Sequence, residues 1–164
     1  MANSASTAVT NFVNNAAYKT PKQEAGVNEK VVTGRSVVNL GANDEHGLVL
    51  LPANAIVTGI TIGSTDMNVT VDVGIYEADR TSVTTTPTAI DPDGLADAVA
   101  FNSEVIDANY VGTGAEANVG KKLFEIAGLA AVDPLKPLYE VAVVATAVTD
   151  GAGTLTWILR YVEP

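Results

Sequence analysis

The sequence predicts a mostly β domain in which one sheet packs on another, as in a sandwich or a barrel. From Lys30 onward, short runs rich in β-branched residues are separated by Gly, Pro, Asn and Asp, which is the spacing typical of such folds. Apolar residues make up 47% of the chain, but aromatic residues only 5%. Since Ala and Val dominate the apolar fraction, we expect a thin core of small side chains. The 164 residues fit one domain, expected at residues 30–164.

The segment before this domain, residues 1–29, is interpreted as an extended N-terminal arm. It is rich in Ala, Asn, Ser and Thr and holds few large apolar residues, so it cannot bury enough surface to order itself. Either it is a disordered terminus with no role, or it becomes ordered by docking onto another molecule. In the second case Phe12, Val13 and Tyr18 are the expected interface anchors.

About eight strands are expected in the domain. They are placed at residues 31–40, 47–51, 55–62, 69–77, 98–106, 121–126, 138–146 and 154–162. Residues 121–126 also fit one or two helical turns, and we favour the strand because its lysines would discourage aggregation at a sheet edge. Residues 81–96 contain two prolines and no periodicity, so they are expected to form a long surface loop.

The patterns within three of these strands predict how each is buried. In "VTVDVGIY", residues 69–76, alternate apolar residues predict one buried face and one mixed face. Gly74 indicates a bulge or the close approach of another backbone, and Asp72 is interpreted as a hydrogen-bonding or solvated group. Residues 138–146 carry a single charge, and residues 154–162 are apolar on both faces. Both segments are therefore expected to be covered, either at the centre of a sheet or against a partner.

The formal net charge of -10 argues against binding to nucleic acid or to an anionic membrane surface, because both need clustered Lys and Arg. The chain has no Cys, so neither a disulfide framework nor a Cys-ligated zinc site is predicted. It also lacks an unbroken apolar run of about 18 residues and a signal-peptide pattern, so we expect neither a membrane-embedded protein nor secretion through a signal peptide.

Candidate catalytic and metal-binding residues each have a simpler interpretation. His46 is the single His, and no Ser lies in a G-x-S-x-G elbow, so His46 is interpreted as a solvated turn residue before a strand. Asp91, Asp93 and Asp97 could ligate calcium, but the Gly and Glu of the twelve-residue calcium loop are not in place, and a Pro-containing turn with Asp caps is favoured. Trp157 is assigned to a core or an interface rather than to sugar stacking.

With 19 acidic residues, a pair of catalytic carboxylates stays open as a third possibility, and it requires acids that converge in a pocket with raised pKa values. No cofactor and no metal are predicted. We expect a non-enzymatic protein whose function lies in the surfaces that it presents.

Four stretches of the chain resemble the capsid decoration or cement proteins, a group of small head proteins of tailed bacteriophages. They are "LPANAIVTGITIGS", "VTVDVGIYEADR", "FNSEVI" after an acidic loop, and "GTLTWILRYV". The likeness spans roughly residues 37–162 and rests on strand and turn patterns. The matching positions are Leu51, Pro52, Asp72, Val73, Gly74, Phe101 and residues 153–162. These positions look like fold determinants rather than functional sites, and the arm has no counterpart.

The resemblance implies a jelly-roll-like antiparallel β-sandwich that forms a homo-oligomer on the outside of an icosahedral phage head. There it would bind the major capsid protein at junctions between its subunits and resist the pressure of packaged DNA. It would be made in the cytoplasm of the host bacterium. An acidic surface fits the capsid exterior better than contact with the genome. The alternative is a carbohydrate- or receptor-binding β-sandwich module of a phage tail fibre or adhesin, which predicts an exposed aromatic cluster in a loop.

Overall fold

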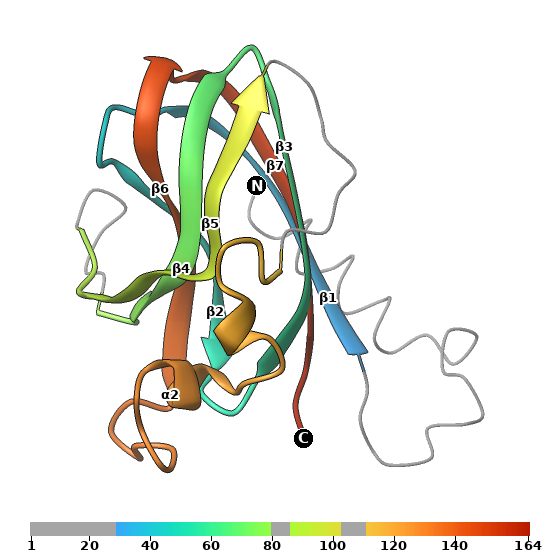
Figure 1. Cartoon of the computed structure of the whole chain (residues 1–164), viewed down its shortest axis with the longest axis vertical. Coiled ribbons are helices and arrows are strands. Elements are labelled where there is room, and N and C mark those ends of the chain that lie inside the picture. Colours follow the sequence, from blue (N-terminus) through green and yellow to red (C-terminus); the bar gives the residue numbers. More distant parts are fainter. Residues whose placement is uncertain (1–28, 80–85, 103–110) are drawn as a thin grey trace.

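A computed structural model of the chain describes residues 29–79, 86–102 and 111–164 (Figure 1). The strands in these residues are β1 (Glu29–Asn39), β2 (Glu45–Pro52), β3 (Ile56–Thr65), β4 (Asn68–Glu77), β5 (Ala89–Asn102), β6 (Leu138–Asp150) and β7 (Ala152–Val162). The helices are η2 (Glu116–Asn118), which is a 3-10 helix, and α2 (Leu123–Ile126). Phe12, Val13 and Tyr18 lie outside the described residues, and of the expected arm only Glu29 is described, as the first residue of β1.

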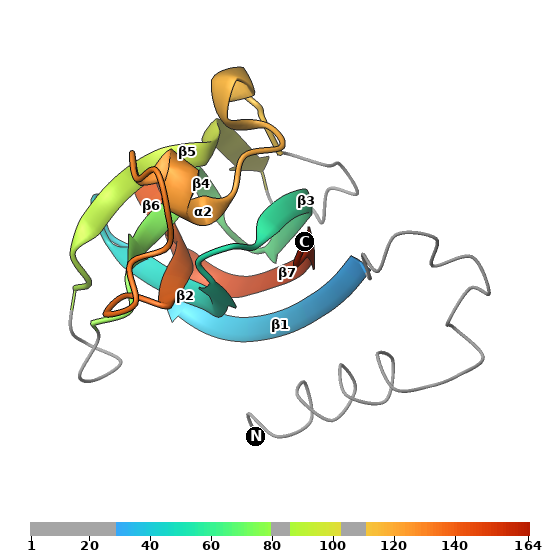
Figure 2. The same ribbon diagram turned by 90° about the horizontal axis from the view of Figure 1, so that it is seen from below.

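The strands form two antiparallel sheets, which Figure 2 shows as two layers. Sheet A has the order β1-β7-β3, and sheet B has the order β2-β6-β4-β5. The predicted all-β antiparallel sandwich is therefore confirmed. The order is that of a jelly roll, in which the first strand pairs with the last and the second with the last but one. One strand of that fold, beside β3, is represented in the described residues only by a bridge between Ile56 and Lys122.

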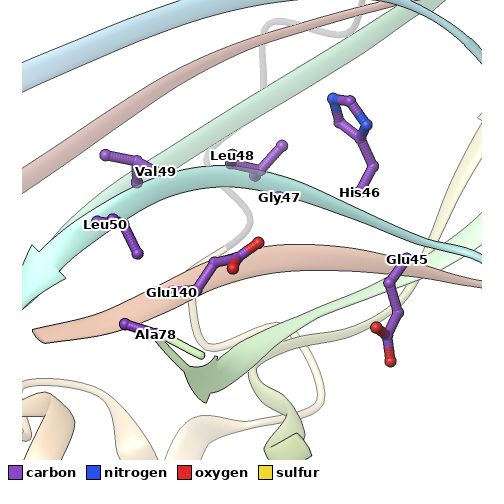
Figure 3. Close-up of a pocket in the computed structure, with 8 residues that line it drawn as sticks. All are labelled: Glu45, His46, Gly47, Leu48, Val49, Leu50, Ala78 and Glu140. Carbon is purple, nitrogen blue, oxygen red and sulfur yellow. The ribbon is translucent and has the colours of Figure 1, made fainter. Parts of the chain in front are cut away.

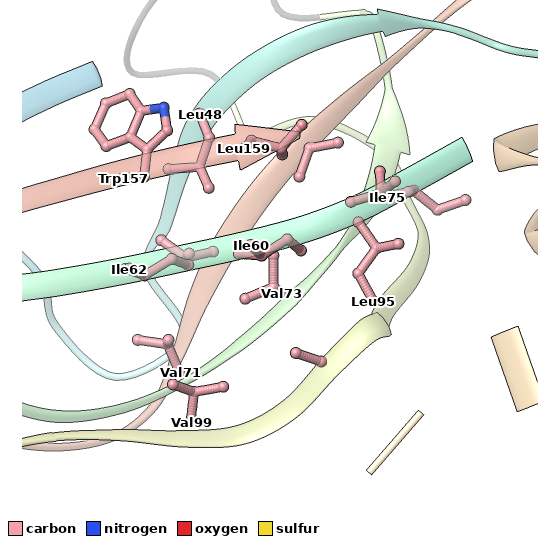
Figure 4. Close-up of a cluster of buried hydrophobic side chains, with 14 of the residues drawn as sticks. Leu48, Ile60, Ile62, Val71, Val73, Ile75, Leu95, Val99, Trp157 and Leu159 are labelled. Atoms are coloured by element: carbon pink, nitrogen blue, oxygen red, sulfur yellow. The ribbon is translucent and has the colours of Figure 1, made fainter. Parts of the chain in front are cut away.

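The core lies between the two sheets and consists mainly of small and medium aliphatic side chains, as expected (Figure 4). On β4, alternate residues point inward and are almost completely buried, which confirms the predicted apolar face of this strand. These residues are Val69, Val71, Val73 and Ile75. Opposite them lie Ile60 and Ile62 of β3 and Leu159 of β7, all fully buried. The apolar periodicity of two residues thus orients each strand toward the other sheet.

The two strands expected to be covered are the central ones. β6 lies between β2 and β4, and β7 lies between β1 and β3. On β7, Trp157 is 8% exposed and lies over the backbone of β1. A Cβ atom added at Gly34 would come within 2.0 Å of the Trp157 ring. The core assignment of Trp157 is confirmed, and Gly34 is the residue that leaves room for it.

Gly74 and Asp72 on the mixed face of β4 also behave as expected. A Cβ atom added at Gly74 would lie 2.2 Å from the carbonyl oxygen of Asp91. The pairing of β4 with β5 shifts register between Val73 and Ile75, so the glycine marks both a bulge and a close backbone approach. The Asp72 carboxylate accepts a hydrogen bond of 2.9 Å from the backbone N–H of Ala98.

The strand predicted at residues 121–126 is wrong, and the helical alternative is correct. The Glu125 carboxylate accepts a hydrogen bond of 2.8 Å from the backbone N–H of Lys122, which caps the helix locally. Leu123 and Phe124 are buried, and their N–H groups donate to backbone carbonyls in the segment before β3. One turn of helix is therefore stabilised by its own cap and by docking onto the end of the sandwich.

The loop predicted at residues 81–96 is wrong in its second half, because β5 begins at Ala89. This strand contains Pro92 and Gly94, which weaken a strand prediction. Pro92 is tolerated because β5 lies at the edge of sheet B, where a proline need not donate a hydrogen bond to a neighbouring strand. Three register shifts between β4 and β5 absorb the irregular residues.

Candidate functional site

Charge separates the two sheets. The strands of sheet B contain eight acidic residues and neither Lys nor Arg. These acids are Glu45, Asp72, Glu77, Asp91, Asp93, Asp97, Glu140 and Asp150. The strands of sheet A contain one acid, Glu29, and three bases, Lys30, Arg35 and Arg160. On a chain with net charge -10, sheet A is therefore a region to which another acidic protein could bind with little repulsion.

The outer side of sheet A, which we call the open face, is made of β-branched, small and basic residues. Its residues are Glu29, Val31, Thr33, Arg35, Val37 and Asn39 on β1, Thr154, Thr156, Ile158, Arg160 and Val162 on β7, and Ile56, Gly59, Thr61, Gly63 and Thr65 on β3. Apart from the two glycines, each of these residues is exposed or half-buried. The face carries a single acid, Glu29, against Arg35 and Arg160, so it is close to neutral.

Local hydrogen bonds hold the side chains of the open face close to the sheet. The Thr58 hydroxyl donates to Glu29 Oε1 at 2.9 Å, and the Thr156 hydroxyl donates to the carbonyl oxygen of Gly63 at 3.3 Å. Part of the polar capacity of the face is therefore satisfied within the chain, which reduces the desolvation penalty when a partner covers it.

β1 forms the rim of the open face and is the most exposed strand of the sandwich (Figure 2). None of its eleven residues is buried, and the side chain of Val37 is 86% exposed. It pairs with β7 along its whole length without a register shift, from Glu29–Val162 to Asn39–Ala152. The opposite side of the strand receives no backbone hydrogen bond from the described residues.

A groove of about 360 Å³ lies on sheet B around β2 and is a candidate for a small-molecule site (Figure 3). It is lined by Glu45, His46, Gly47, Leu48, Val49, Leu50, Ala78 and Glu140. The His46 ring and the Glu45 carboxylate lie on opposite sides of β2. The ring packs edge-on against Trp157, at 6.0 Å between centroids. The only imidazole of the chain therefore packs against the core and does not converge with this carboxylate.

These positions correct the interpretation of His46 as a turn residue, since it lies within β2 and is half-buried.

A second groove of about 320 Å³ lies beside the first and contains an ion pair between Lys136 and Glu77. The hydrogen bond that the Lys136 ammonium group donates to the Glu77 carboxylate raises the pKa of Lys136. The Lys136 ammonium group balances the charge of the Glu77 carboxylate, as in a structural ion pair.

Asp91, Asp93 and Asp97 lie on β5 rather than in a turn, and Asp93 and Asp97 lie close to Asp72 of β4. Burial raises the pKa of Asp91, and the neighbouring Asp93 acts in the same direction. Burial likewise raises the pKa of Asp72, with Asp97 adding to the effect and the Ala98 amide partly offsetting it. The Asn118 side chain donates to Asp91 Oδ2 at 3.3 Å.

Within the described part of the chain, no group of three or more His, Cys, Asp or Glu side chains is arranged to hold a metal ion. In the same residues, no helix is long and apolar enough to cross a membrane. The described aromatic side chains are buried or half-buried, whereas a sugar- or receptor-binding loop would present them to solvent. This arrangement does not favour the receptor-binding alternative.

The sequence did not reveal the open face, although one signal pointed toward it. Residues 154–162 were noted for apolar groups on both faces, and this segment became the central strand of sheet A, with Ile158 half-buried on the outside. The scarcity of acid in the three strands of sheet A could also have been seen. Those strands are far apart in the sequence, however, and only their pairing joins them into one surface.

Comparison with known proteins gives no family for this chain, since no family model and no curated protein matches it. Two solved structures resemble the fold. A chain of the structure titled "Capsid of Ralstonia phage GP4" is 19% identical with a TM-score of 0.44, over 82% of this chain and 85% of that chain. A chain of "Cyanophage Pam1 capsid asymmetric unit" is 18% identical with a TM-score of 0.39, over 88% of this chain and 91% of that chain. Values this low assign neither a family nor a function.

Proposed function

We propose that this chain is a non-enzymatic virion structural protein, a decoration or cement protein that binds the outer surface of an icosahedral phage head. The observation that carries the proposal is the open face of sheet A, a nearly neutral surface on a strongly acidic chain. The sequence resemblance to phage head proteins gives the class of partner. The major capsid protein is the expected partner, and the capsid exterior the expected location.

The composition of the open face suits a protein interface. The centre of an interface is typically poor in charged residues, while Arg is enriched there relative to other charged groups. The open face meets both conditions, with Ile158 and Thr61 at its centre and Arg35 and Arg160 among them. Docking by sheet A would leave most of the acids of sheet B uncovered, where solvent screens their mutual repulsion.

The size of the open face limits how it can bind. A sheet of three strands of about ten residues measures about 34 by 14 Å, or roughly 500 Å². A stable interface usually buries about 800 Å² on each partner. One open face therefore falls short of a stable contact by itself, and we propose that residues 1–29, with Phe12, Val13 and Tyr18 as anchors, or a second copy of the chain contributes the remaining area.

Binding to undecorated heads tests the proposal. The purified chain is mixed with expanded heads that lack it, and occupancy is measured by co-sedimentation and cryo-electron microscopy. Ile158→Glu places an unpaired charge at the centre of the open face and should lower the affinity on the order of tenfold or more. Leu50→Glu, at an exposed position on β2, is the matched control and should bind as the unchanged chain does.

Failure of the purified chain to bind the undecorated heads would refute the proposed function. Equal loss of binding by both variants would mean that the docking surface does not lie on sheet A. Thermal unfolding of each variant shows that a loss of binding does not come from loss of the fold.

A further inference from the structure

We propose that β1 is a self-pairing edge, along which a second copy of this chain adds its own β1 in antiparallel orientation. The two copies of sheet A would then form one continuous six-stranded sheet. This inference goes beyond the proposed function, because it concerns association in solution and requires no capsid.

The four sheet edges of the sandwich differ in how they are protected from pairing. β5 is bulged, and its outer side accepts and donates hydrogen bonds to the segment at residues 112–113. β3 has a register shift between Val57 and Gly59 and is bridged at its start by Lys122. β2 has a register shift after Gly47. β1 alone among these edges is long and unbulged, and proteins normally avoid leaving such an edge open.

Apart from the exposed Arg35, the side chains of β1 do not supply the usual protection either. A lysine that projects from an edge strand discourages pairing, but Lys30 is held by its own chain. Its ammonium group lies 2.6 Å from Glu163 Oε1 and 5.7 Å from the centre of the Tyr161 ring. The strand contains no proline, and Val37 is the second most exposed of the large apolar side chains in the described residues.

The sequence of β1 fits a two-fold pair centred on Gly34. In that register all eleven residues of each strand are paired. Val31 of each copy lies opposite Val37 of the other, which gives two such pairs. Such pairs of β-branched residues stabilise antiparallel strands. A register centred on Arg35 would instead place two arginines opposite each other, which is unfavourable.

Electrostatics also select a second copy at this edge. Two chains of net charge -10 repel each other over most of their surfaces. β1 carries Glu29, Lys30 and Arg35 and so has no excess of acid. Pairing here brings the copies together where their mutual repulsion is weakest. It also doubles the open face to about 1,000 Å², which exceeds the area of a standard contact.

The test uses the full-length chain and two double variants that differ at one residue. Val31→Glu/Val37→Glu places like charges opposite each other at two points of the proposed register, whereas Val31→Glu/Val37→Lys places opposite charges there. Glu at position 31 also faces Arg160 of its own chain, so both variants should fold. By sedimentation velocity, we expect the dimer of the first variant to be weaker than that of the second on the order of tenfold.

Two further variants separate this interface from others. Leu50→Glu/Leu135→Glu carries the same net charge as the first variant but changes exposed residues away from β1, and it should dimerise as the unchanged chain does. Since the chain has no Cys, Val31→Cys/Val37→Cys should form a disulfide-linked dimer on oxidation. A monomeric unchanged chain at millimolar concentration, or equal dimerisation of the two charge variants, would overturn the proposal. Loss of the dimer only in the Leu50 and Leu135 variant would assign the contact to the grooves of sheet B and would also overturn it.

Discussion

The two sheets share one core but differ in charge, regularity and edges. Sheet A carries one acid against three bases, and its first strand pairs with β7 without a shift over eleven residues. Sheet B carries eight acids, and each of its three pairings contains at least one register shift. Both sheets bury an equally apolar inner face. The inner faces therefore explain why the chain folds as a sandwich, and the outer faces explain what each sheet can contact.

The comparison shows that shifts in strand register and acidic residues are concentrated in the same sheet, sheet B. A strand with shifts in register cannot template a further strand, and carboxylates repel a second acidic chain. Both edges of sheet B have a register shift and its strands carry eight acids, whereas sheet A carries one acid and its β1 edge has no register shift. A surface that avoids association and a surface that can take part in it are thus built from different strands of one small domain.

The largest expected effect concerns the inner and outer sides of sheet A. Leu159→Ala removes a fully buried side chain and should lower the free energy of unfolding by about 2–5 kcal/mol. Ile158→Ala changes the adjacent, half-buried residue of the open face and should lower it by less than about 1 kcal/mol. Chemical denaturation of both variants measures the difference. Equal effects would mean that the open face is covered in the folded chain.

The next effect compares the glycines at the register shifts of the two sheets. Gly74→Ala in sheet B would place a methyl group 2.2 Å from the backbone of Asp91 and Pro92 and should destabilise the fold by about 1–3 kcal/mol. Gly59→Ala in sheet A meets only the Arg160 side chain, at 3.4 Å, and should change stability by less than about 1 kcal/mol. Similar melting temperatures for the two variants would contradict the tighter packing of β4 on β5.

The smallest effect concerns the acids of sheet B and depends on pH. Since the pKa of Asp91 is raised in the folded chain, its ionisation opposes folding, so the stability linked to its neutral form is present at low pH and is lost as the pH rises through the raised pKa. Asp91→Asn should therefore increase stability at pH 7 by less than about 1 kcal/mol, because most of the group is solvated. The gain should vanish below the ordinary Asp value of 3.8.

Asp79→Asn is the control of opposite sign for this prediction. Hydrogen bonds from Thr88 lower the pKa of Asp79, so its stabilising effect is present above the ordinary value and is lost as the pH falls through the lowered pKa. At pH 7 this variant should be less stable than the unchanged chain. Thermal melts from pH 3 to pH 7 measure the stability of both variants. A gain in stability for Asp79→Asn would contradict the expected opposite effects of the two substitutions.

Most of the fold could be predicted from the sequence because strand periodicity is local. The alternation in residues 69–76 identified the buried face of β4, and Gly74 marked the close approach of β5. The errors arose where distant residues override local preference. Pro92 argues against a strand, yet the edge position of β5 accommodates it. Lys122 and Leu123 read as an edge strand, yet the cap from Glu125 and the carbonyl groups before β3 make a helical turn.

The candidate site was harder to predict than the fold. The open face joins β7 to β1 and β3, which lie much earlier in the chain, and no local pattern specifies their pairing. Val37 reads in the sequence as one more apolar strand residue, and only its place at a sheet edge makes it 86% exposed. His46 gave the opposite error, since its polar neighbours suggested solvent while Trp157 packs against it.

The pairing of β1 with β7 also governs when this protein can fold during its synthesis. Glu29 pairs with Val162 and Asn39 with Ala152, so β1 cannot pair with β7 until β7 has left the ribosome. Long-range strand pairing is intrinsically slow to form. An incomplete chain can assemble parts of sheet B, but it cannot assemble sheet A. The surface proposed for docking therefore exists only on molecules that contain β7, and products truncated before it would be unable to compete for its partners.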